Sequence, residues 1–230
     1  MLMRTAMHPN SSRHALTVRG RSGLPPAPHG AASPLDLMGA PMPFARNVEI
    51  YGENEPAEYI YKVISGTVRT YRVLHDGRRQ IAAFLLPGDM FGLEAGATHG
   101  SSAEAIADSV VLVIKRSAVT ALAERDSEVA RQLWTLTAQE LGRVQNHMLL
   151  LVRNAQERIA SFLLEMAARA PGTDSVELPM SRQDIADYLG LTIETVSRTL
   201  TQLEDQAAIA LPTSRRVVLR NPSALRRLNA

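Results

Sequence analysis

Three side chains near the C-terminal end have the types and spacing of a hydrogen-bonding surface on one side of a helix. Glu194, Ser197 and Arg198 are three and four positions apart, so helical periodicity places them on one face. Arginine can donate two parallel hydrogen bonds to one flat edge, a carboxylate accepts from an amine, and a serine hydroxyl does either. Base edges in the major groove of DNA offer these partners, and a merely solvated helix face is the alternative interpretation.

A short amphipathic helix is predicted just before this face. Ser181 and Asp184 have the spacing of a capping box, in which each side chain satisfies a free backbone amide at the start of a helix. Apolar residues follow at helical spacing, and Gly190 ends the helix because glycine tolerates a positive φ. The small side chain of Ala186 leaves room for a second helix to approach closely.

The second helix is predicted to begin after Thr192, whose hydroxyl can cap it. Ile193, Val196, Leu200 and Leu203 recur at helical spacing and form its apolar side, opposite the hydrogen-bonding face. Two short helices joined by a glycine corner make a helix-turn-helix. The second helix of this motif fits the major groove, where its first turns reach base edges.

A β-hairpin is predicted after the second helix. Two short apolar runs, residues 208–211 and 217–220, flank the segment from Pro212 to Arg216. The hairpin makes the motif a winged variant, and Arg215 and Arg216 near its tip can bind DNA phosphates. A solvated loop is an equally open interpretation of these two arginines.

Overall charge gives no support for nucleic-acid binding. The formal net charge is +2, and residues 171–230 hold 7 basic and 7 acidic residues. Any affinity for DNA must therefore come from a few placed side chains. The chain has no cysteine, which excludes disulfides, thiolate metal sites and iron–sulfur clusters. Ser181 is for this reason the first position at which an engineered replacement of cysteine would be sought.

The middle of the chain has the pattern of a small antiparallel sandwich or jelly roll. Short β-type runs alternate with turn residues, and Asp76-Gly77 is a hairpin signal between two of them. The predicted strands are residues 59–64, 67–74, 80–86 and 109–114.

Residues 127–151 predict one long helix, because the stretch contains no proline and its apolar residues recur at helical spacing. Steps of three and four alternate along one side, as in a coiled-coil seam. Leu133, Leu136 and Leu150 form a second stripe beside the seam. We expect one face to pack on the chain's own sandwich and the other to pair with a second subunit, a single buried helix being the alternative. The predicted seam consists of Ala130, Trp134, Thr137, Leu141, Val144, Met148 and Leu151.

Four regions are expected along the chain. Residues 1–46 are rich in Pro, Gly, Ser and Arg, which predicts a disordered or loosely attached arm. Residues 47–124 form the sandwich, residues 125–154 the dimerisation helix, and residues 155–230 a DNA-binding domain that begins with a helix at 156–169. No run reaches the roughly 18–20 apolar residues that span a bilayer, and no continuous apolar stretch follows the early arginines, so we expect no secretory signal. We expect a cytoplasmic protein with no membrane partner.

The segment from Leu178 to Leu200, LPMSRQDIADYLGLTIETVSRTL, resembles the Crp/Fnr family of bacterial regulators and, within it, the FixK-type branch. The string Gly-Leu-Thr-x-Glu-Thr-Val-Ser-Arg is highly specific, and the order of parts over residues 48–219 is similar to that of the family. The resemblance implies an α+β fold with an N-terminal β-roll of the cyclic-nucleotide-binding type, a long dimerisation helix and a C-terminal winged helix-turn-helix.

The resemblance also implies roles for single residues and for partners. Glu194, Ser197 and Arg198 match the positions that read a TTGA half-site, repeated inverted as TTGA…TCAA, and Ile193 can meet a thymine methyl. The residues expected to contact DNA phosphates are Arg182, Gln183, Thr192, Thr195, Arg215 and Arg216. Activation is expected, because relatives touch RNA polymerase with a loop that corresponds here to Pro171, Gly172, Thr173, Asp174, Ser175 and Val176.

The resemblance does not carry a ligand to the β-roll. Cyclic-AMP-binding relatives place a Gly-Glu pair and an Arg-Ser pair around the phosphate, but the corresponding residues 88–94 and 101–105 contain no arginine. A haem would need a ligand such as His75 or His99, and a lone loop histidine is far more often solvated. We expect no cofactor and a regulator that is active without a bound effector.

Two other functions stay open. One is an effector-gated regulator with an unidentified small ligand in the roll. The other is a cupin-like metalloenzyme, which needs histidines and a carboxylate converging on one metal. His75 and His99 are 24 residues apart and form no His-x-His motif, so we expect neither a metal site nor enzyme activity.

Overall fold

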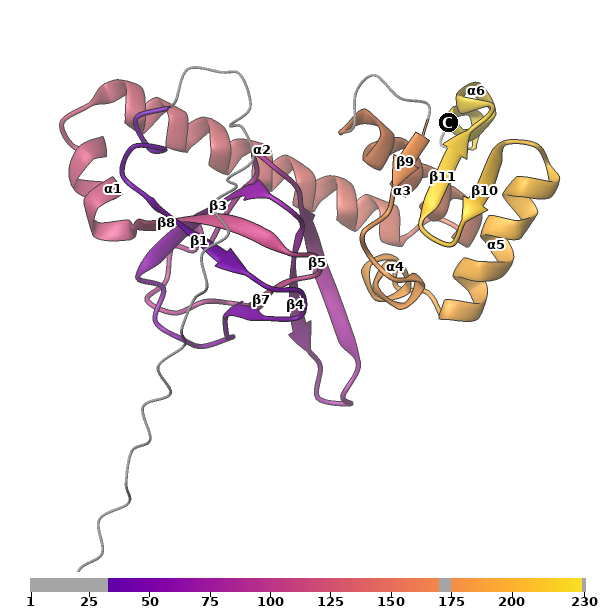
Figure 1. Ribbon diagram of the computed structural model, residues 1–230, viewed down its shortest axis with the longest axis horizontal. Coiled ribbons are helices and arrows are strands. Elements are labelled where there is room, and N and C mark those ends of the chain that lie inside the picture. Colours follow the sequence, from indigo (N-terminus) through magenta and orange to yellow (C-terminus); the bar gives the residue numbers. More distant parts are fainter. Residues whose placement is uncertain (1–32, 170–174, 229–230) are drawn as a thin grey trace, which may run out of the picture. The chain divides into compact units, whose positions relative to one another are not determined.

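The computed structural model describes residues 33–169 and 175–228. Its first half is a β-roll made of two four-stranded antiparallel sheets (Figure 1). The strands are β1 (Ala40–Phe44), β2 (Glu49–Tyr51), β3 (Tyr59–Ser65), β4 (Val68–Val73), β5 (Arg79–Leu85), β6 (Met90–Phe91), β7 (Ser102–Ala105) and β8 (Ser109–Lys115). One sheet has the order β1-β8-β3-β6 and the other β2-β7-β4-β5.

Alternating apolar residues build the core of this roll. Val63 of β3 lies opposite Val111 of β8, and both side chains are fully buried. Val68 and Leu85 of the second sheet belong to the same apolar cluster, as expected when the inner faces of two sheets interdigitate. β4 and β5 are joined by the predicted hairpin, where Gly77 has a φ of 80° that glycine adopts without strain. The four predicted strands correspond to β3, β4, β5 and β8.

The prediction of a loose arm over residues 1–46 is wrong for its last part. Leu35 is 1% exposed in the core, and β1 pairs with β8 along its whole length. β1 lies at the edge of its sheet, where Pro41 and Pro43 are tolerated because one side of an edge strand has no partner and the missing N–H of a proline costs no hydrogen bond there. The boundary of the roll therefore lies at or before residue 33, and residues 1–32 lie outside the described part.

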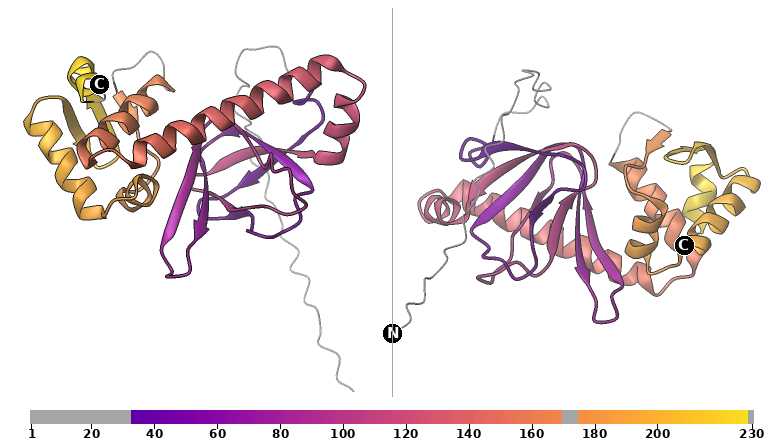
Figure 2. Two further views of the ribbon diagram at one scale, coloured as in Figure 1. Left: turned by 180° about the vertical axis from the view of Figure 1, so that it is seen from behind. Right: turned by 60° about the horizontal axis from the view of Figure 1, so that its bottom comes forward.

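Two helices follow the roll. A short helix, α1 (Arg116–Ala123), leads into α2 (Ser127–Leu151), whose first amides are capped by Asp126. Figure 2 shows α2 running across the roll and on toward the C-terminal helices. The predicted long helix is thus confirmed in its extent. In the described part of the chain, no helix is both long and apolar enough to cross a membrane.

The C-terminal part is a compact bundle of helices with a small sheet. Its helices are α3 (Ala155–Ala168), α4 (Arg182–Leu189), α5 (Ile193–Asp205) and α6 (Pro222–Arg227), and its strands are β9 (Ser175–Glu177), β10 (Ile209–Thr213) and β11 (Arg216–Leu219). The sheet has the order β10-β11-β9, so the predicted hairpin is present and gains a third strand.

The core of the C-terminal part continues into the roll. Ile81 and Phe84 of β5 are buried in the same apolar cluster as Phe162 of α3 and Tyr188 of α4. The rings of Phe84 and Tyr188 are 5.1 Å apart between centroids. β5 therefore serves both as a strand of the roll and as a packing surface for the C-terminal helices.

Candidate nucleic-acid interface

The first helix of the helix-turn-helix begins with a complete capping box. The Ser181 hydroxyl oxygen accepts from the backbone amide of Asp184 at 3.1 Å, and the Ser181 amide donates to the Asp184 carboxylate at 2.9 Å. The predicted start of α4 is confirmed. The idea that Ser181 replaces a cysteine stays a prediction, and a thiol there would be a weaker cap than the hydroxyl.

The corner between the two helices also follows the sequence pattern. Gly190 has φ 62° and ψ 40°, the left-handed conformation that ends α4. The guanidinium of Arg158 on α3 donates to the carbonyl oxygen of Leu189 at 2.8 Å and so satisfies a free helix end. Ala186 and Val196 are both fully buried in one apolar cluster, as expected if the two helices approach closely.

The reading face of α5 is exposed. Val196, Leu200 and Leu203 are buried on one side of the helix, and Thr199 joins them at 5% exposure. Glu194, Ser197 and Arg198 are exposed on the other side, and Ile193 is 37% exposed. Within the described ranges, no hydrogen bond or ion pair engages the Arg198 guanidinium. A planar donor on a rigid helix is therefore free to meet an outside acceptor.

Glu194 is prepared to act as an acceptor. Its own backbone amide and the Thr192 hydroxyl donate to the carboxylate, and these hydrogen bonds lower its pKa. The carboxylate is therefore ionised at neutral pH. Thr192 also caps α5 by accepting from the Thr195 amide at 3.2 Å, and the two threonine hydroxyls lie 3.1 Å apart.

The two expected phosphate contacts on α4 differ in their freedom. Arg182 is half-buried, its Nη1 has no hydrogen-bond partner among the described residues, and burial lowers the pKa of its guanidinium. Because the Nη1 atom is itself buried, the guanidinium must turn outward before it can meet a phosphate. Gln183 is exposed, but its amide donates to the Asp187 carboxylate at 2.6 Å, so it must leave this partner to reach a phosphate.

The wing carries two arginines in different situations. Arg215 lies in the turn between β10 and β11 and is exposed. The Arg216 guanidinium donates to the Ser175 hydroxyl at 2.8 Å and lies 3.9 Å from the Glu177 carboxylate. Arg215 is the freer of the two for a phosphate.

The predicted polymerase loop is only partly described. Residues 171–174 lie outside the described residues. Val176 is 2% exposed in β9, where it pairs with Val217 of β11, so its side chain belongs to the core and not to a contact surface. The prediction is wrong for this residue because alternation along a strand turns every second side chain inward.

The predicted dimer seam is exposed in the single chain. Trp134 is 77%, Leu141 57% and Met148 65% exposed, whereas Leu133 and Leu136 of the second stripe pack against the roll. Of the seven seam residues only Leu151 is partly covered. α2 is thus not a singly buried helix, and its outer face leaves large apolar side chains in water.

His99 corrects the sequence interpretation of the two roll histidines. His75 is exposed in the hairpin, as expected for a solvated histidine, but His99 is 1% exposed. Its ring stacks on Tyr51 with centroids 3.6 Å apart, and its Nδ1 lies 3.3 Å from the Glu94 carboxylate. The loop before it is held down by Arg116, which donates to the Gly96 carbonyl at 2.7 Å. No local pattern around His99 signals this fold-back.

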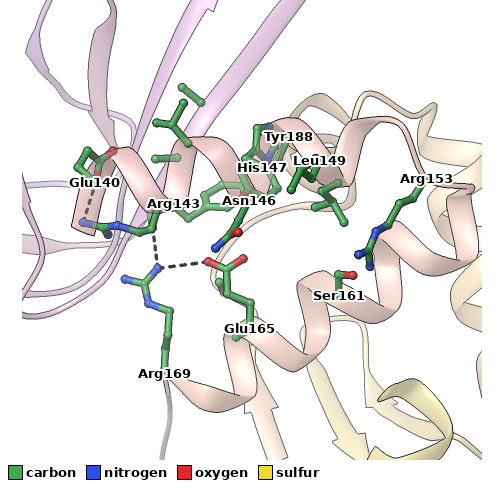
Figure 3. Close-up of a pocket in the computed structure, with 16 residues that line it drawn as sticks. Glu140, Arg143, Asn146, His147, Leu149, Arg153, Ser161, Glu165, Arg169 and Tyr188 are labelled. Carbon is green, nitrogen blue, oxygen red and sulfur yellow. Dashed lines mark hydrogen bonds and ion pairs between the residues drawn. The ribbon is translucent and has the colours of Figure 1, made fainter. Parts of the chain in front are cut away.

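A cavity of about 400 Å³ lies between β5, α2 and α3 (Figure 3). Arg143 pairs with Glu140 at 2.8 Å, and Arg169 pairs with Asp89. Burial raises the pKa of Glu165, and the positive charges of Arg169 and Arg143 partly offset this increase. Among the described residues, no group of three or more His, Cys, Asp and Glu can hold a metal ion.

Protonation of His147 in this cavity is expected to destabilise the fold. Its ring lies 4.2 Å from that of Tyr188, and burial lowers its pKa. The unfolded chain therefore binds a proton more readily than the folded chain. The contribution of His147 to the free energy of unfolding is present above the unfolded pKa near 6.5 and is lost as the pH falls through that value toward the lower pKa of the folded state. The ring is only partly buried, so we expect a loss of less than about 1 kcal/mol between pH 7.5 and 5.5 that His147→Gln lacks. Urea unfolding at both pH values measures it, with the exposed-site variant His75→Gln as control; equal losses in wild type and His147→Gln would contradict the assignment.

Comparisons with known proteins agree with this architecture. The family model described as "Crp-like helix-turn-helix domain" matches residues 157–228, and that described as "Cyclic nucleotide-binding domain" matches residues 41–126. The nitrogen fixation regulation protein FixK of Azorhizobium caulinodans is 55% identical over 199 residues, which cover 84% of this chain and 80% of that protein. FixK of Rhizobium meliloti is 45% identical over 181 residues, or 78% of this chain and 82% of that protein.

The solved structure of FixK2 from Bradyrhizobium japonicum superposes with a TM-score of 0.81 at 52% identity, covering 84% of this chain and 98% of that one. A β-roll, a long helix and a winged helix-turn-helix with these relatives define a DNA-binding transcription regulator. The chain belongs to the Crp/Fnr family, and the FixK proteins are among its relatives. The expected family and fold are confirmed.

Proposed function

We propose that the chain is a homodimeric transcription activator that reads an inverted TTGA…TCAA site with α5 and contacts RNA polymerase. The observation that carries the proposal is the exposed face of Glu194, Ser197 and Arg198, in which the arginine has no partner in the described part of the chain. Arg198 is suited to donate to the O6 and N7 atoms of a guanine, and Glu194 to accept from a cytosine amine. The proposed phosphate contacts are Arg182, whose Nη1 has no hydrogen-bond partner among the described residues, and the exposed Arg215.

The apolar face of α2 supports a dimer. Exposed side chains such as Trp134, Leu141 and Met148 lie along one side of a 25-residue helix, which is about 37 Å long at 1.5 Å per residue. Fully burying each large apolar side chain is worth about 1.5–3 kcal/mol. A symmetric pair of these helices can bring two reading helices about 34 Å apart, the length of one DNA turn.

The roll interior supports activity without a bound effector. The rings of His99 and Tyr51 are buried in the roll and stack on each other. Residues 88–94 and 101–105 contain no arginine that could neutralise the phosphate of a cyclic nucleotide. We propose that the protein needs no cofactor, performs no catalysis and is controlled by its amount. The proposed polymerase contact rests on the resemblance of residues 171–175 to the loop that relatives use.

In vitro selection of DNA from random sequence tests the proposal. Full-length protein is expected to enrich an inverted repeat of TTGA with a fixed spacing, because two identical reading helices related by a two-fold axis impose both features. Enrichment of an unrelated sequence would contradict the assigned base contacts. Enrichment of a single half-site would contradict the dimer.

A second candidate is an effector-gated regulator, favoured by the cavity that Figure 3 shows. A volume of about 400 Å³ lined by apolar and charged side chains is within the range of small-ligand sites. An in vitro transcription assay with purified components distinguishes the two functions. Full activation by the protein alone favours the first proposal, whereas activation only after addition of a small molecule that also raises the melting temperature favours the second.

A further inference from the structure

An ion cluster joins the β-roll to the first helix of the helix-turn-helix. It consists of Arg69 on β4, Arg79 on β5, Glu104 on β7, and Asp184 and Asp187 on α4. Arg69 donates to Asp184 at 2.5 Å and to both carboxylate oxygens of Glu104 at 3.0 Å. Arg79 donates to Asp184 at 2.6 Å and to Asp187 at 2.9 Å. Residues more than 100 positions apart in the chain thus share one set of charges.

Asp184 has two tasks in this cluster. One of its carboxylate oxygens accepts from the amide and the hydroxyl of Ser181 and so completes the cap of α4. The other oxygen accepts from both Arg69 and Arg79. The group that starts the helix is therefore the same group that ties the helix to the roll.

The cluster is shielded from water. The side chains of Arg69 and Asp184 are 10% and 7% exposed, and that of Asp187 is 13% exposed. Buried ion pairs add little net stability, but removing one partner leaves an uncompensated charge and so penalises every arrangement in which the pair is broken. Arrangements of α4 that separate these charges are therefore penalised.

The orientation of α4 passes directly to the reading helix. Two further contacts hold α4 beside the cluster. Phe84 packs against Tyr188, and the side-chain amide of Gln80 donates to the backbone carbonyl of Asp187 at 2.8 Å. Ala186 of α4 and Val196 of α5 are fully buried in one apolar cluster, so a change in the orientation of α4 is expected to be passed to α5. In this arrangement Arg198 is exposed.

We propose that Arg69 and Arg79 are positioning residues for DNA recognition: from the β-roll, without touching DNA, they hold α4 and α5 in the orientation that binds the site. The inference rests on the proposed reading function of α5. It adds that the roll, which binds no ligand in the proposed function, acts as a rigid support for α4 and α5.

Arg79→Ala is the test variant, because Arg79 is 25% exposed and its loss disturbs the roll less than loss of Arg69. The matched control is Arg78→Ala, since the neighbouring Arg78 is 77% exposed and, among the described residues, pairs with Asp76 of its own hairpin alone. Because the chain has no cysteine, single cysteines can be introduced at the exposed positions Lys115 and Gln202 for nitroxide labels on the roll and on α5. Doubly labelled protein is diluted with unlabelled protein, so that each dimer reports one intramolecular distance.

The wild-type protein and Arg78→Ala are expected to give one narrow distance distribution. Arg79→Ala is expected to broaden it and to weaken binding of the selected DNA site about tenfold, with unchanged base preferences, and Arg79→Lys to recover part of both. A narrow distribution, or unchanged or tighter DNA binding, in Arg79→Ala would overturn the proposal. If Arg79→Ala does not fold, as judged by its melting curve, Asp187→Ala breaks the same pair from the other side and carries the same outcomes. A failure of the proposed reading function would instead appear in the wild-type protein, which would enrich a DNA sequence other than the inverted TTGA repeat although its distance distribution is narrow.

Discussion

Replacing Arg198 with alanine is expected to weaken specific DNA binding by about 1–3 kcal/mol and to relax selectivity at one base pair in each half-site. The guanidinium is exposed on the first half of α5 and has no partner in residues 33–169 or 175–228, so its loss leaves the fold unchanged. In the proposed complex, the variant lacks the bidentate pair of hydrogen bonds to a base edge. Titration of the selected site and of its single-base variants at one fixed salt concentration measures both effects.

The control must remove a positive charge elsewhere, because any lost arginine weakens DNA binding through electrostatics. Arg46→Ala does so at an exposed position of the roll, remote in sequence from the reading helix. It is expected to leave the base preferences unchanged. Equal selectivity of Arg198→Ala and wild type at every base pair would refute the assignment of Arg198.

Replacing Leu141 with glutamate is expected to give a monomer at micromolar concentration and to lower specific DNA affinity at least about 100-fold. Leu141 is 57% exposed in the single chain, so the change spares the chain's own core. In a paired seam it places two like charges in an apolar contact, where unpaired ions are strongly disfavoured. A monomer contacts one half-site instead of two. The expected 100-fold loss equals two tenfold steps in affinity, each worth about 1.4 kcal/mol of binding free energy.

Sedimentation equilibrium and DNA titration measure the two effects. Gln139→Glu is the matched control, because it adds the same charge to an exposed position of α2 outside the seven seam residues. It is expected to remain dimeric. A dimeric Leu141→Glu protein would show that the chains associate through a surface other than this face.

Much of the candidate interface could be predicted because its signals are local. A capping box, a glycine corner and apolar residues at helical spacing each depend on positions a few residues apart, and α4 and α5 begin and end at these residues. The same holds for the hairpin at Asp76-Gly77 and for the extent of α2. Even the outward direction of Trp134 and the inward direction of Leu133 follow from periodicity along one helix.

The features that sequence reasoning missed depend on contacts between distant segments. β1 exists because β8 offers it an edge, and a stretch with two prolines shows no strand pattern by itself. His99 is buried because a loop folds back onto Tyr51, which no residue near it announces. Val176 is turned into the core only by its pairing with β11.

The reading face of Glu194, Ser197 and Arg198 shows the same division. The presence of these residues on one helix face is determined by the sequence alone, since helical periodicity requires nothing beyond the chain's local conformation. The direction in which that face points is decided only by the tertiary structure. Asp184 is predicted from the sequence as a helix cap, but the fold brings Arg69 and Arg79 to it from strands more than 100 residues earlier, and those ion pairs orient the helix.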